Sequence, residues 1–509
     1  MALNNIQTYQ EGQTPPVMGQ TTGTVDDVRN PSQAVLAMQV NWDKVTTLLG
    51  GTKAMRLAAT KYLPKWVNES PNEYDFRLKT SVLFNAFGHT VAGLGGKPFG
   101  RPVSWSENTP PDIASWFSNV DLTGRSLHVF AQEVFTTGIA YGLTHVLVDY
   151  PRTDGIVTVA QEKAAGARPY LVHVKPDSIL GWRSDMSSGV EVLTQLRILE
   201  CVYEDDGPFA SKAVDQVRVL EPGTWATYRQ RTVKVGKTAV IEWYLYDQGT
   251  NTFKTIPLVT FYTNRTGFMT AESPLIDIAD LNIQHWQVSS DMYSILHTAS
   301  VPILTLIGIE GNEEGSAPVT VGAKSALKLP QGATAHFTEH SGKAVASGRQ
   351  SLQDLEEQMR LLGAEMLVKK PGQATATQAT LDTSQQRSEL QSLTSIFEDT
   401  MDQVIQVMGA WSNMTGDTGD LDFYKDFLLT ADDAVQQSLL FSMATVGLLS
   451  QQSFYEEMQR RDVLDTDRDW EAEQERIKSQ PLPMPSPLKP GVVQLPKAPS
   501  SSVTQALND

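Results

Sequence analysis

The residues that most suggest chemistry are the glycines and the lysine of Gly93-Leu94-Gly95-Gly96-Lys97, which superficially resemble a phosphate-binding loop. A Walker loop needs a Ser or Thr after the lysine to bind magnesium, and a strand before the glycines. Here Pro98 follows the lysine, and the preceding residues favour a helix. The dinucleotide-binding pattern also fails, because Pro98 occupies the position of its last glycine. We therefore expect this segment to end a helix and not to bind a nucleotide.

Two groups of residues could in principle bind metal. Asp417, Asp420 and Asp422 lie close together, but the longer ligand series of a calcium loop, which ends in a bidentate glutamate, is missing. His336 and His340 are four residues apart, but they lie in a sequence that favours a strand and a turn, not one helix face. We expect turn and capping roles for the aspartates and no metal site at the histidines.

The sequence also gives little indication of nucleophilic catalysis or of recognition of nucleic-acid bases. No Gly-x-Ser-x-Gly motif is present, and Cys201 lies in an apolar strand context that favours an inert core thiol. Trp182-Arg183 and Tyr228-Arg229 could stack on single-stranded nucleic acid, but isolated pairs of this kind usually pack on a strand face. We expect no catalytic residues, no cofactor and no metal. An enzyme acting on nucleic acid through a metal site built from distant carboxylates remains an alternative.

Length and composition limit the class of protein. The chain has 509 residues, of which 40% are hydrophobic, with Lys+Arg 41 against Asp+Glu 58, for a net charge of -17. This balance argues against simple adhesion to DNA or to anionic lipid, since both need clustered cations. One cysteine permits no internal disulfide. No secretory signal and no apolar run of about 18 residues is visible, so we expect a large acidic soluble protein inside the cell.

Helices are predicted from caps and from apolar periodicity. Ser70 and Glu73 form a capping-box pattern that opens a helix running to about Val91. Ser273 as a cap, followed by Pro274, opens a long helix that reaches about Thr298. The other predicted helices cover about 126–137, 351–367, 381–411 and, as shorter pieces, 431–478.

Strands are predicted mainly between about residues 140 and 263. The apolar, β-branched segment Tyr141–Pro151 reads as a buried strand that a proline stops. The further predicted strands cover 170–174, 191–203, 216–219, 224–229, 239–246 and 258–262, followed by 303–309, 325–329 and 334–338. The two ends of the chain, rich in Thr, Gln and Gly or in Pro, are expected to be flexible. The fold class is α+β.

The order of these elements resembles the portal proteins of tailed bacteriophages, which are the head–tail connectors. The resemblance spans about Tyr62 to Trp411. The segments that carry it are Tyr62-Leu63-Pro64, Glu69 to Tyr74, Val146 to Pro151, Tyr170 to Arg183, Glu272-Ser273-Pro274-Leu275, Leu327 to Gly332, Leu355 to Leu367 and Ala374 to Ala379.

The resemblance implies a portal-type fold with a helical and β wing, long stem helices, a small β-containing clip and a helical crown. The implied parts are a flexible arm (1–32), the wing (33–272), the first stem helix (273–298), the clip (299–350), the second stem helix (351–367), the tunnel loop (368–380), the long wing helix (381–420), the crown (421–478) and a proline-rich tail (479–509).

The resemblance also implies a function. Such a protein forms a ring, usually dodecameric, at one capsid vertex of the virion after assembly in the host cytoplasm. Double-stranded DNA passes through its channel without sequence specificity during packaging and ejection. The implied partners are further copies of the chain, the terminase large subunit, a head–tail adaptor, and the major capsid and scaffolding proteins, with no membrane. Another minor virion structural protein remains an alternative.

Two hypotheses about sites follow. In the tunnel loop, Lys369 and Lys370 are expected to form one of few basic rings in a repulsive lumen, with two solvated lysines after a helix as the alternative. The neighbouring loop residues expected to face DNA are Gln373, Thr375 and Thr377. In the clip, an apolar run too small to cover itself is expected to pair strands with neighbouring subunits. The expected clip contacts to subunits or to the adaptor are Ile303, Leu304, Leu306, Ile307, Lys324 and Lys328.

Overall fold

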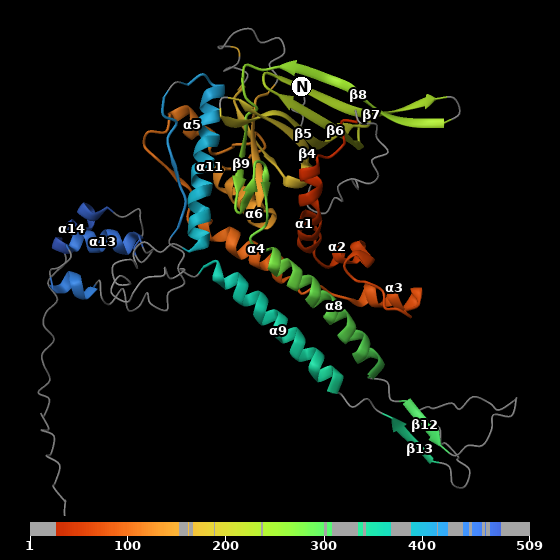
Figure 1. Cartoon of the computed structure of the whole chain (residues 1–509). Helices are drawn as coiled ribbons and strands as arrows, with labels where there is room; N and C mark the ends of the chain where they lie inside the picture. Colours follow the sequence, from red (N-terminus) through yellow and green to blue (C-terminus); the bar gives the residue numbers. More distant parts are fainter. Residues whose placement is uncertain are drawn as a thin grey trace, which may run out of the picture. The chain divides into compact units, whose positions relative to one another are not determined.

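The computed structural model divides the chain into two compact units, Met1–Phe427 and Leu428–Asp509. The structure describes residues 27–151, 161, 166–187, 189–235, 238–299, 303–307, 334–338, 343–367, 388–414, 416–425, 441–446, 450–460, 464 and 469–479. Within the first unit, helices and antiparallel sheets are mixed, which confirms the α+β class (Figure 1).

Helices of the first unit begin mostly at serine or asparagine caps. The α-helices are α1 (Gln33–Leu49), α2 (Gly51–Ala58), α3 (Pro71–Thr80), α4 (Ala86–Gly96), α5 (Pro111–Trp116), α6 (Leu127–Tyr141), α8 (Ile276–Ala299), α9 (Lys343–Glu365) and α11 (Glu389–Trp411). The short 3-10 helices are η1 (Ala59–Lys61), η2 (Lys97–Phe99) and η3 (Pro176–Ser178). The predicted capping box of α3 is confirmed, since the Ser70 hydroxyl accepts from the Glu73 amide and the Glu73 carboxylate accepts from the Ser70 amide.

Strands of the first unit pair antiparallel in several small sheets. They are β1 (Ser104–Trp105), β2 (Leu143–Asp149), β3 (Tyr170–Val174), β4 (Ile179–Ser187), β5 (Val190–Asp205), β6 (Ser211–Glu221), β7 (Thr224–Val235), β8 (Thr238–Thr250), β9 (Leu258–Tyr262), β10 (Arg265–Gly267), β11 (Thr270–Ala271), β12 (Ile303–Ile307), β13 (Thr334–Thr338) and β14 (Leu421–Asp422). The largest sheet has the order β4-β5-β6-β7-β8, and a second sheet has the order β3-β2-β9.

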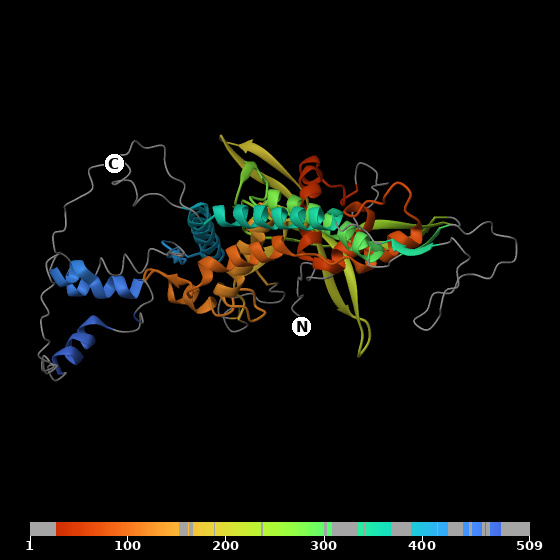
Figure 2. The same cartoon turned by 90° about the horizontal axis from the view of Figure 1, so that it is seen from below.

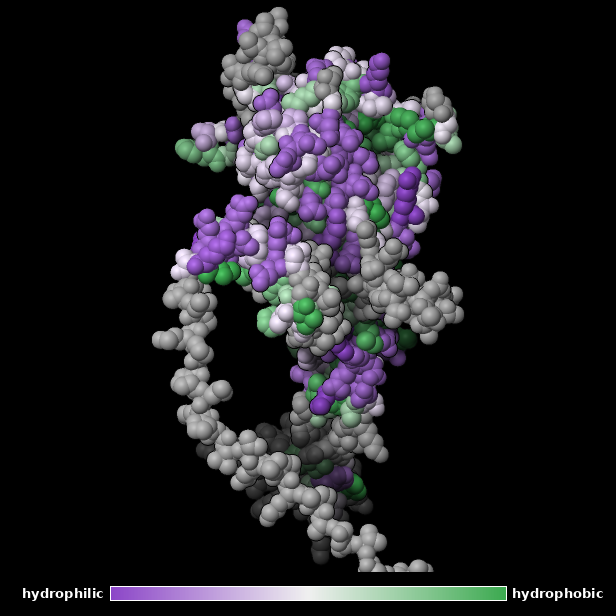
Figure 3. Space-filling view, turned by 90° about the vertical axis from the view of Figure 1, so that its left-hand side faces the viewer, coloured by the Kyte–Doolittle hydropathy of each residue, from purple (hydrophilic) through white to green (hydrophobic). Residues whose placement is uncertain are grey.

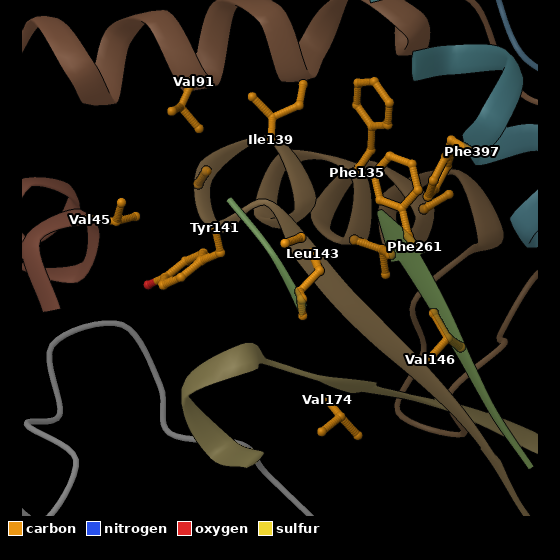
Figure 4. Packing of buried hydrophobic residues seen from close by; sticks show 14 of the residues in the cluster. Val45, Val91, Phe135, Ile139, Tyr141, Leu143, Val146, Val174, Phe261 and Phe397 are labelled. Carbon is orange, nitrogen blue, oxygen red and sulfur yellow. The ribbon is translucent and has the colours of Figure 1, made fainter. Parts of the chain in front are cut away.

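The core of the first unit lies where α6 and α11 pack on the three-stranded sheet (Figure 4). Phe135 from α6, Phe261 from β9 and Phe397 from α11 form a buried aromatic group, with ring centroids 4.9–5.6 Å apart. Phe99 and Phe423 extend this group at its edge. The core therefore joins residues from the first and last parts of the unit.

Several predicted boundaries are wrong. The helix expected from Ser70 to Val91 is two helices, because the backbone is extended at Ser81 and Asn85 caps a new helix. The helix expected from Ser351 begins earlier, since α9 already runs from Lys343. The helix expected near residue 381 begins at Glu389, after the N-cap Ser388.

Other differences concern segments that carried weaker signals. The structure contains α1, α2 and β4, which the apolar pattern did not predict. The expected flexible arm is wrong for its last residues, because Val28 accepts from Arg197 and the Ser32 amide donates to Leu180. The glycine-rich segment does end a helix as expected, since Gly96 is the last residue of α4. The predicted strand at 325–329 falls outside the described residues.

The second unit contains described helices that fit the predicted shorter pieces. They are a helical segment at 441–446, α13 (Gln451–Arg460) and α14 (Trp470–Ser479). The rings of Tyr455 and Trp470 join α13 to the start of α14, with centroids 5.2 Å apart. The ring of Phe441 lies 6.3 Å from that of Phe454 in the same way.

Candidate functional site: the helix pair α8–α9

The helices α8 and α9 lie side by side and antiparallel (Figures 1 and 2). Gly348 near the start of α9 meets Met292 near the end of α8, while Gly363 near the end of α9 meets Ile278 near the start of α8. Buried residues of the seam include Ile278, Met292 and, from α9, Leu355 and Met359. At about 1.5 Å per residue, each helix is roughly 35 Å long.

Glycines of α9 set how closely the helices approach. A Cβ atom added at Gly348 would lie 2.2 Å from the Met292 Sδ, and one added at Gly363 would lie 3.1 Å from the Thr90 Cγ2 of α4. Both distances are shorter than the usual separation of nonbonded carbon or sulfur atoms. The absence of side chains at these two positions therefore allows α9 to pack against α8 and α4.

One buried amide joins the α3–α4 break to α8. Asn282 is fully buried, and its Oδ1 accepts from the Phe87 amide at 3.0 Å. Its Nδ2 donates to the Phe84 carbonyl at 2.7 Å. Those backbone groups flank the start of α4, where the extended break leaves them without helical partners. Asn282 thus supplies the hydrogen bonds that the interrupted helix lacks.

A buried arginine fixes α3 to α8. Arg77 is 3% exposed, and its Nε and Nη2 donate to the two carboxylate oxygens of Glu69 at 2.6 and 2.8 Å. Its Nη1 reaches the Ser290 Oγ of α8 at 3.4 Å, and its guanidinium lies 4.4 Å from the Trp66 ring centre. Hydrogen bonding to Arg77 lowers the pKa of Glu69 below its usual value, against the opposing effect of burial. The charge is thus held in a bidentate pair, which is the geometry that tolerates burial.

The outward face of α9 is acidic. Asp354, Glu357, Leu361 and Glu365 are exposed and fall on one side of the helix at about 100° per residue. Leu355 and Met359 lie on the opposite side and are buried. Figure 3 shows the side of the molecule at the left of Figure 1, where described residues are mostly hydrophilic with scattered hydrophobic ones. A helix pair of this composition presents carboxylates to whatever it faces.

A two-stranded ribbon follows α8 and precedes α9 in the chain. β12 and β13 pair over five residues, from Ile303↔Thr338 to Ile307↔Thr334. Among the described residues neither strand pairs with a third strand. Ile307 is 54% exposed and Phe337 is 57% exposed. Isolated two-stranded ribbons are marginally stable in water, so this one has the character of a segment that is completed by another surface.

The structure tests only part of the predicted sites. Lys369, Lys370, Gln373, Thr375, Thr377, Lys324 and Lys328 lie outside the described residues, and for Ile303, Leu304 and Leu306 only the backbone is described. The strands predicted at 303–309 and 334–338 are present as β12 and β13, and the structure adds that they pair with each other within the chain. Pairing with neighbouring subunits stays a prediction.

The candidates for chemistry take structural positions. Asp417 accepts from the Gly419 amide, which fits the expected turn role. Cys201 is buried, and burial raises the pKa of its thiol, as expected of an inert core cysteine. In the part of the chain that the structure describes, no three His, Cys, Asp or Glu side chains gather to hold a metal ion. No described helix is long and apolar enough to cross a membrane.

Sequence reasoning missed the residues that position the pair. Asn282 is a polar residue on the apolar side of α8, and Arg77 is a cation between the buried or half-buried Tyr74 and Leu78 of α3. A polar side chain on a buried helix face needs a partner, so this conflict with the apolar pattern was an available signal. The partners of Asn282, and the Ser290 contact of Arg77, lie about 200 residues away and have no sequence signal of their own, whereas Glu69, the ion-pair partner of Arg77, is only eight residues away.

Comparison with known proteins adds three observations. Residues 274–412 match a family described as a domain of unknown function, DUF4055. No curated protein matches the sequence. Among solved structures, the chain is similar to a chain from the neck of a native GTA particle computed with C12 symmetry, at 11% identity and a TM-score of 0.38, over 78% of this chain and 96% of that one.

Two further solved chains show likeness of the same strength. One is from the neck of an empty GTA particle computed with C6 symmetry, at 12% identity and a TM-score of 0.37, over 72% of this chain and 87% of that one. The other is from the virion of a native gene transfer agent particle, at 12% identity and a TM-score of 0.36, over 78% and 96% of the two chains. Likenesses this distant leave the function to be argued from the chain's own residues.

Proposed function

We propose that the chain is a portal protein of a tailed bacteriophage, a structural protein without enzymatic activity. Its copies form a ring, most simply of twelve, at one vertex of the capsid. Double-stranded DNA passes through the channel during packaging and ejection, and the ring docks the terminase large subunit and later the head–tail adaptor. The capsid and scaffolding proteins surround it in the virion.

One observation carries the proposal: a helix pair that leads to a separate β-ribbon. α8 and α9 leave the folded part of the first unit together, and the β12–β13 ribbon lies between them in the chain (Figure 1). The order of stem helix, clip and stem helix is the one that the sequence resemblance implies. The exposed Phe337 and the two-stranded pairing indicate a ribbon that neighbouring copies complete.

The charges agree with a conduit for a polyanion. Clustered cations would bind the DNA phosphates tightly and in a salt-dependent way, and this binding would stop the DNA from sliding through the channel. The net charge of -17 per chain instead favours repulsion. Repulsion keeps the DNA mobile along the channel axis, while few basic positions retain it.

Electron microscopy and native mass spectrometry of the purified full chain test the proposal. The expected result is a ring with a central hole and an integral number of copies. A monomeric particle without a hollow axis refutes it. Magnesium-dependent nuclease or ATPase activity of the pure protein would support the nucleic-acid enzyme instead.

A matched pair of clip variants tests the ribbon. Phe337→Asp places a charge on the exposed apolar position of β13, and we expect rings that dissociate at lower denaturant concentration. His336→Asp is the control, because His336 is also exposed but lies on the other face of the same strand. Equal ring stability in the two variants contradicts the proposed role of the ribbon.

A further inference from the structure

A groove lies between α2 and α3, outside the helix pair already described. Its volume is about 510 Å³ and it is open to solvent. The side chains that line it include Lys53, Arg56, Leu57, Asp75, Leu78 and Lys79. Leu57 is 71% exposed, so the groove combines an apolar wall with three cations and one carboxylate.

Its positive charge is only partly neutralised. Lys79 pairs with Asp75 at 2.7 Å. Arg56 donates to the Ser81 carbonyl at 2.8 and 3.1 Å, and among the described residues neither it nor Lys53 forms an ion pair with a carboxylate. In a chain of net charge -17, this is an apolar groove with a basic rim. Its chemistry fits an acidic segment that also carries an apolar side chain.

The groove and the outward face of α9 lie on opposite sides of α8, and both face away from it. On α3, Asp75 and Lys79 lie two residues before and after Arg77, so at about 100° per residue they are opposite the side chain that contacts α8. On α9, Leu361 and its neighbours lie opposite the seam with α8. Figure 1 shows α8 between α9 on one side and α2 and α3 on the other.

The outward face of α9 has the chemistry that the groove requires. Leu361 is 51% exposed and is flanked one turn before and one turn after by Glu357 and Glu365, with Asp354 a further turn away. Arg360 pairs with Glu357 at the flank of this face. The α9 face is thus a protruding apolar side chain between carboxylates, and the groove is an apolar depression between cations. The two surfaces are complementary in shape and in charge.

We propose that the outward face of α9 of one copy docks in the α2–α3 groove of the next copy. This contact rests on the ring proposed above and names one interface within it. Because the two surfaces are different and lie on opposite sides of α8, the contact is heterologous, and a pair of joined copies retains one free groove and one free α9 face. Contacts of this kind continue from copy to copy until the ring closes.

Charge reversal on each surface tests the contact. The groove variant is Lys53→Glu with Lys79→Glu, and the helix variant is Asp354→Lys with Glu365→Lys. A third variant carries all four substitutions. The control is Lys212→Glu with Lys254→Glu, which makes the same change in charge at exposed positions outside the groove. Circular dichroism and thermal unfolding confirm the fold of each variant, and ring formation is followed by mass photometry.

We expect the groove and helix variants each to need at least about tenfold more protein for half-assembly at low salt, since two attractive pairs become repulsive. The defect should shrink in about 1 M salt, where the Debye length is about 3 Å. The four-substitution variant should assemble again, and so should an equimolar mixture of the two defective variants, because each supplies the complement of the other.

Different outcomes separate this contact from the ring itself. Normal assembly of both single-surface variants overturns the contact, as does a four-substitution variant no better than the single ones. A helix variant that forms normal rings but changes DNA passage places the α9 face toward the DNA, which also overturns the contact and leaves the ring intact. Failure of the unaltered chain to form rings refutes the proposed function instead.

Discussion

A buried histidine in the central strand β2 should make the first unit sensitive to acid. His145 is 1% exposed, lies between β3 and β9, and its Nδ1 is 2.9 Å from the Thr260 Oγ1. Burial, with a smaller effect of the neighbouring His173, lowers the pKa of His145 to about 3. An exposed histidine in the unfolded chain has a pKa of about 6.5. The unfolded state therefore binds a proton at a higher pH than the folded state does.

The sign and size of the effect follow from this difference. Stability from the neutral His145 is present above pH 6.5 and is lost as the pH falls from 6.5 toward 3. One pKa unit corresponds to about 1.4 kcal/mol, so at pH 4.5 the lost free energy of unfolding is about 3 kcal/mol. His145→Gln keeps hydrogen-bonding atoms near Thr260 but takes up no proton. We expect its loss of stability between pH 7.5 and pH 4.5 to be smaller than that of the unaltered chain by about this amount.

Urea unfolding at both pH values, followed by tryptophan fluorescence and near-ultraviolet circular dichroism, measures this difference. The pH effects of groups that do not interact with His145 are shared by the two proteins and cancel in the comparison. His89→Gln is the matched control, because His89 is an exposed histidine of the same unit. The reasoning is refuted if His145→Gln loses as much stability on acidification as the unaltered chain does.

Three further changes have expected outcomes. Gly348→Ala should lower the free energy of unfolding by about 1–3 kcal/mol, because the added Cβ would collide with Met292 of α8. Gly93→Ala is the control: its Cβ would have no atom within 4 Å, so thermal unfolding should show a neutral or slightly stabilising effect. Burial and nearby carboxylates raise the pKa of Asp402 to about 6, so its folded form loses stability as the pH rises from about 4 through 6. Asp402→Asn should therefore raise the melting temperature at pH 7.5 and not at pH 4; a raised melting temperature at both values contradicts this. Replacing Lys369 and Lys370 by Gln should alter DNA packaging or retention while rings still form. If packaging and retention are unchanged, the hypothesis that these lysines form a basic ring in the channel is wrong.

Short-range signals in the sequence predicted short-range structure well. The Ser70–Glu73 capping box and the strands β3 and β9 are where the caps, turn residues and apolar runs indicated. These features depend on residues within a few positions of one another, so one sequence contains the whole signal. The helices α8 and α9 were predicted for the same reason, although they begin at residues other than those expected, while their pairing was implied only by the resemblance.

Long-range contacts decided the features that the sequence did not reveal. Apolar periodicity continues through Ser81 and Asn85, so nothing local predicted the break between α3 and α4. The break is held by Asn282, which comes about 200 residues later in the chain. The α2–α3 groove depends in the same way on the separate packing of two helices. Neither the positioning residues nor the groove could be placed without the fold.

The phenylalanine cluster has a consequence for synthesis on the ribosome. Phe397 completes a core whose other members include Phe99, Phe135 and Phe261, and Phe423 packs on it last. At roughly 5–20 residues per second, the ribosome takes on the order of 20–85 s to reach that residue. Until then the nascent chain keeps apolar aromatic surface uncovered, and no copy can reach its final shape. We therefore expect chaperones to bind the chain during translation, and the association between copies that we propose would begin only when each chain is almost fully made.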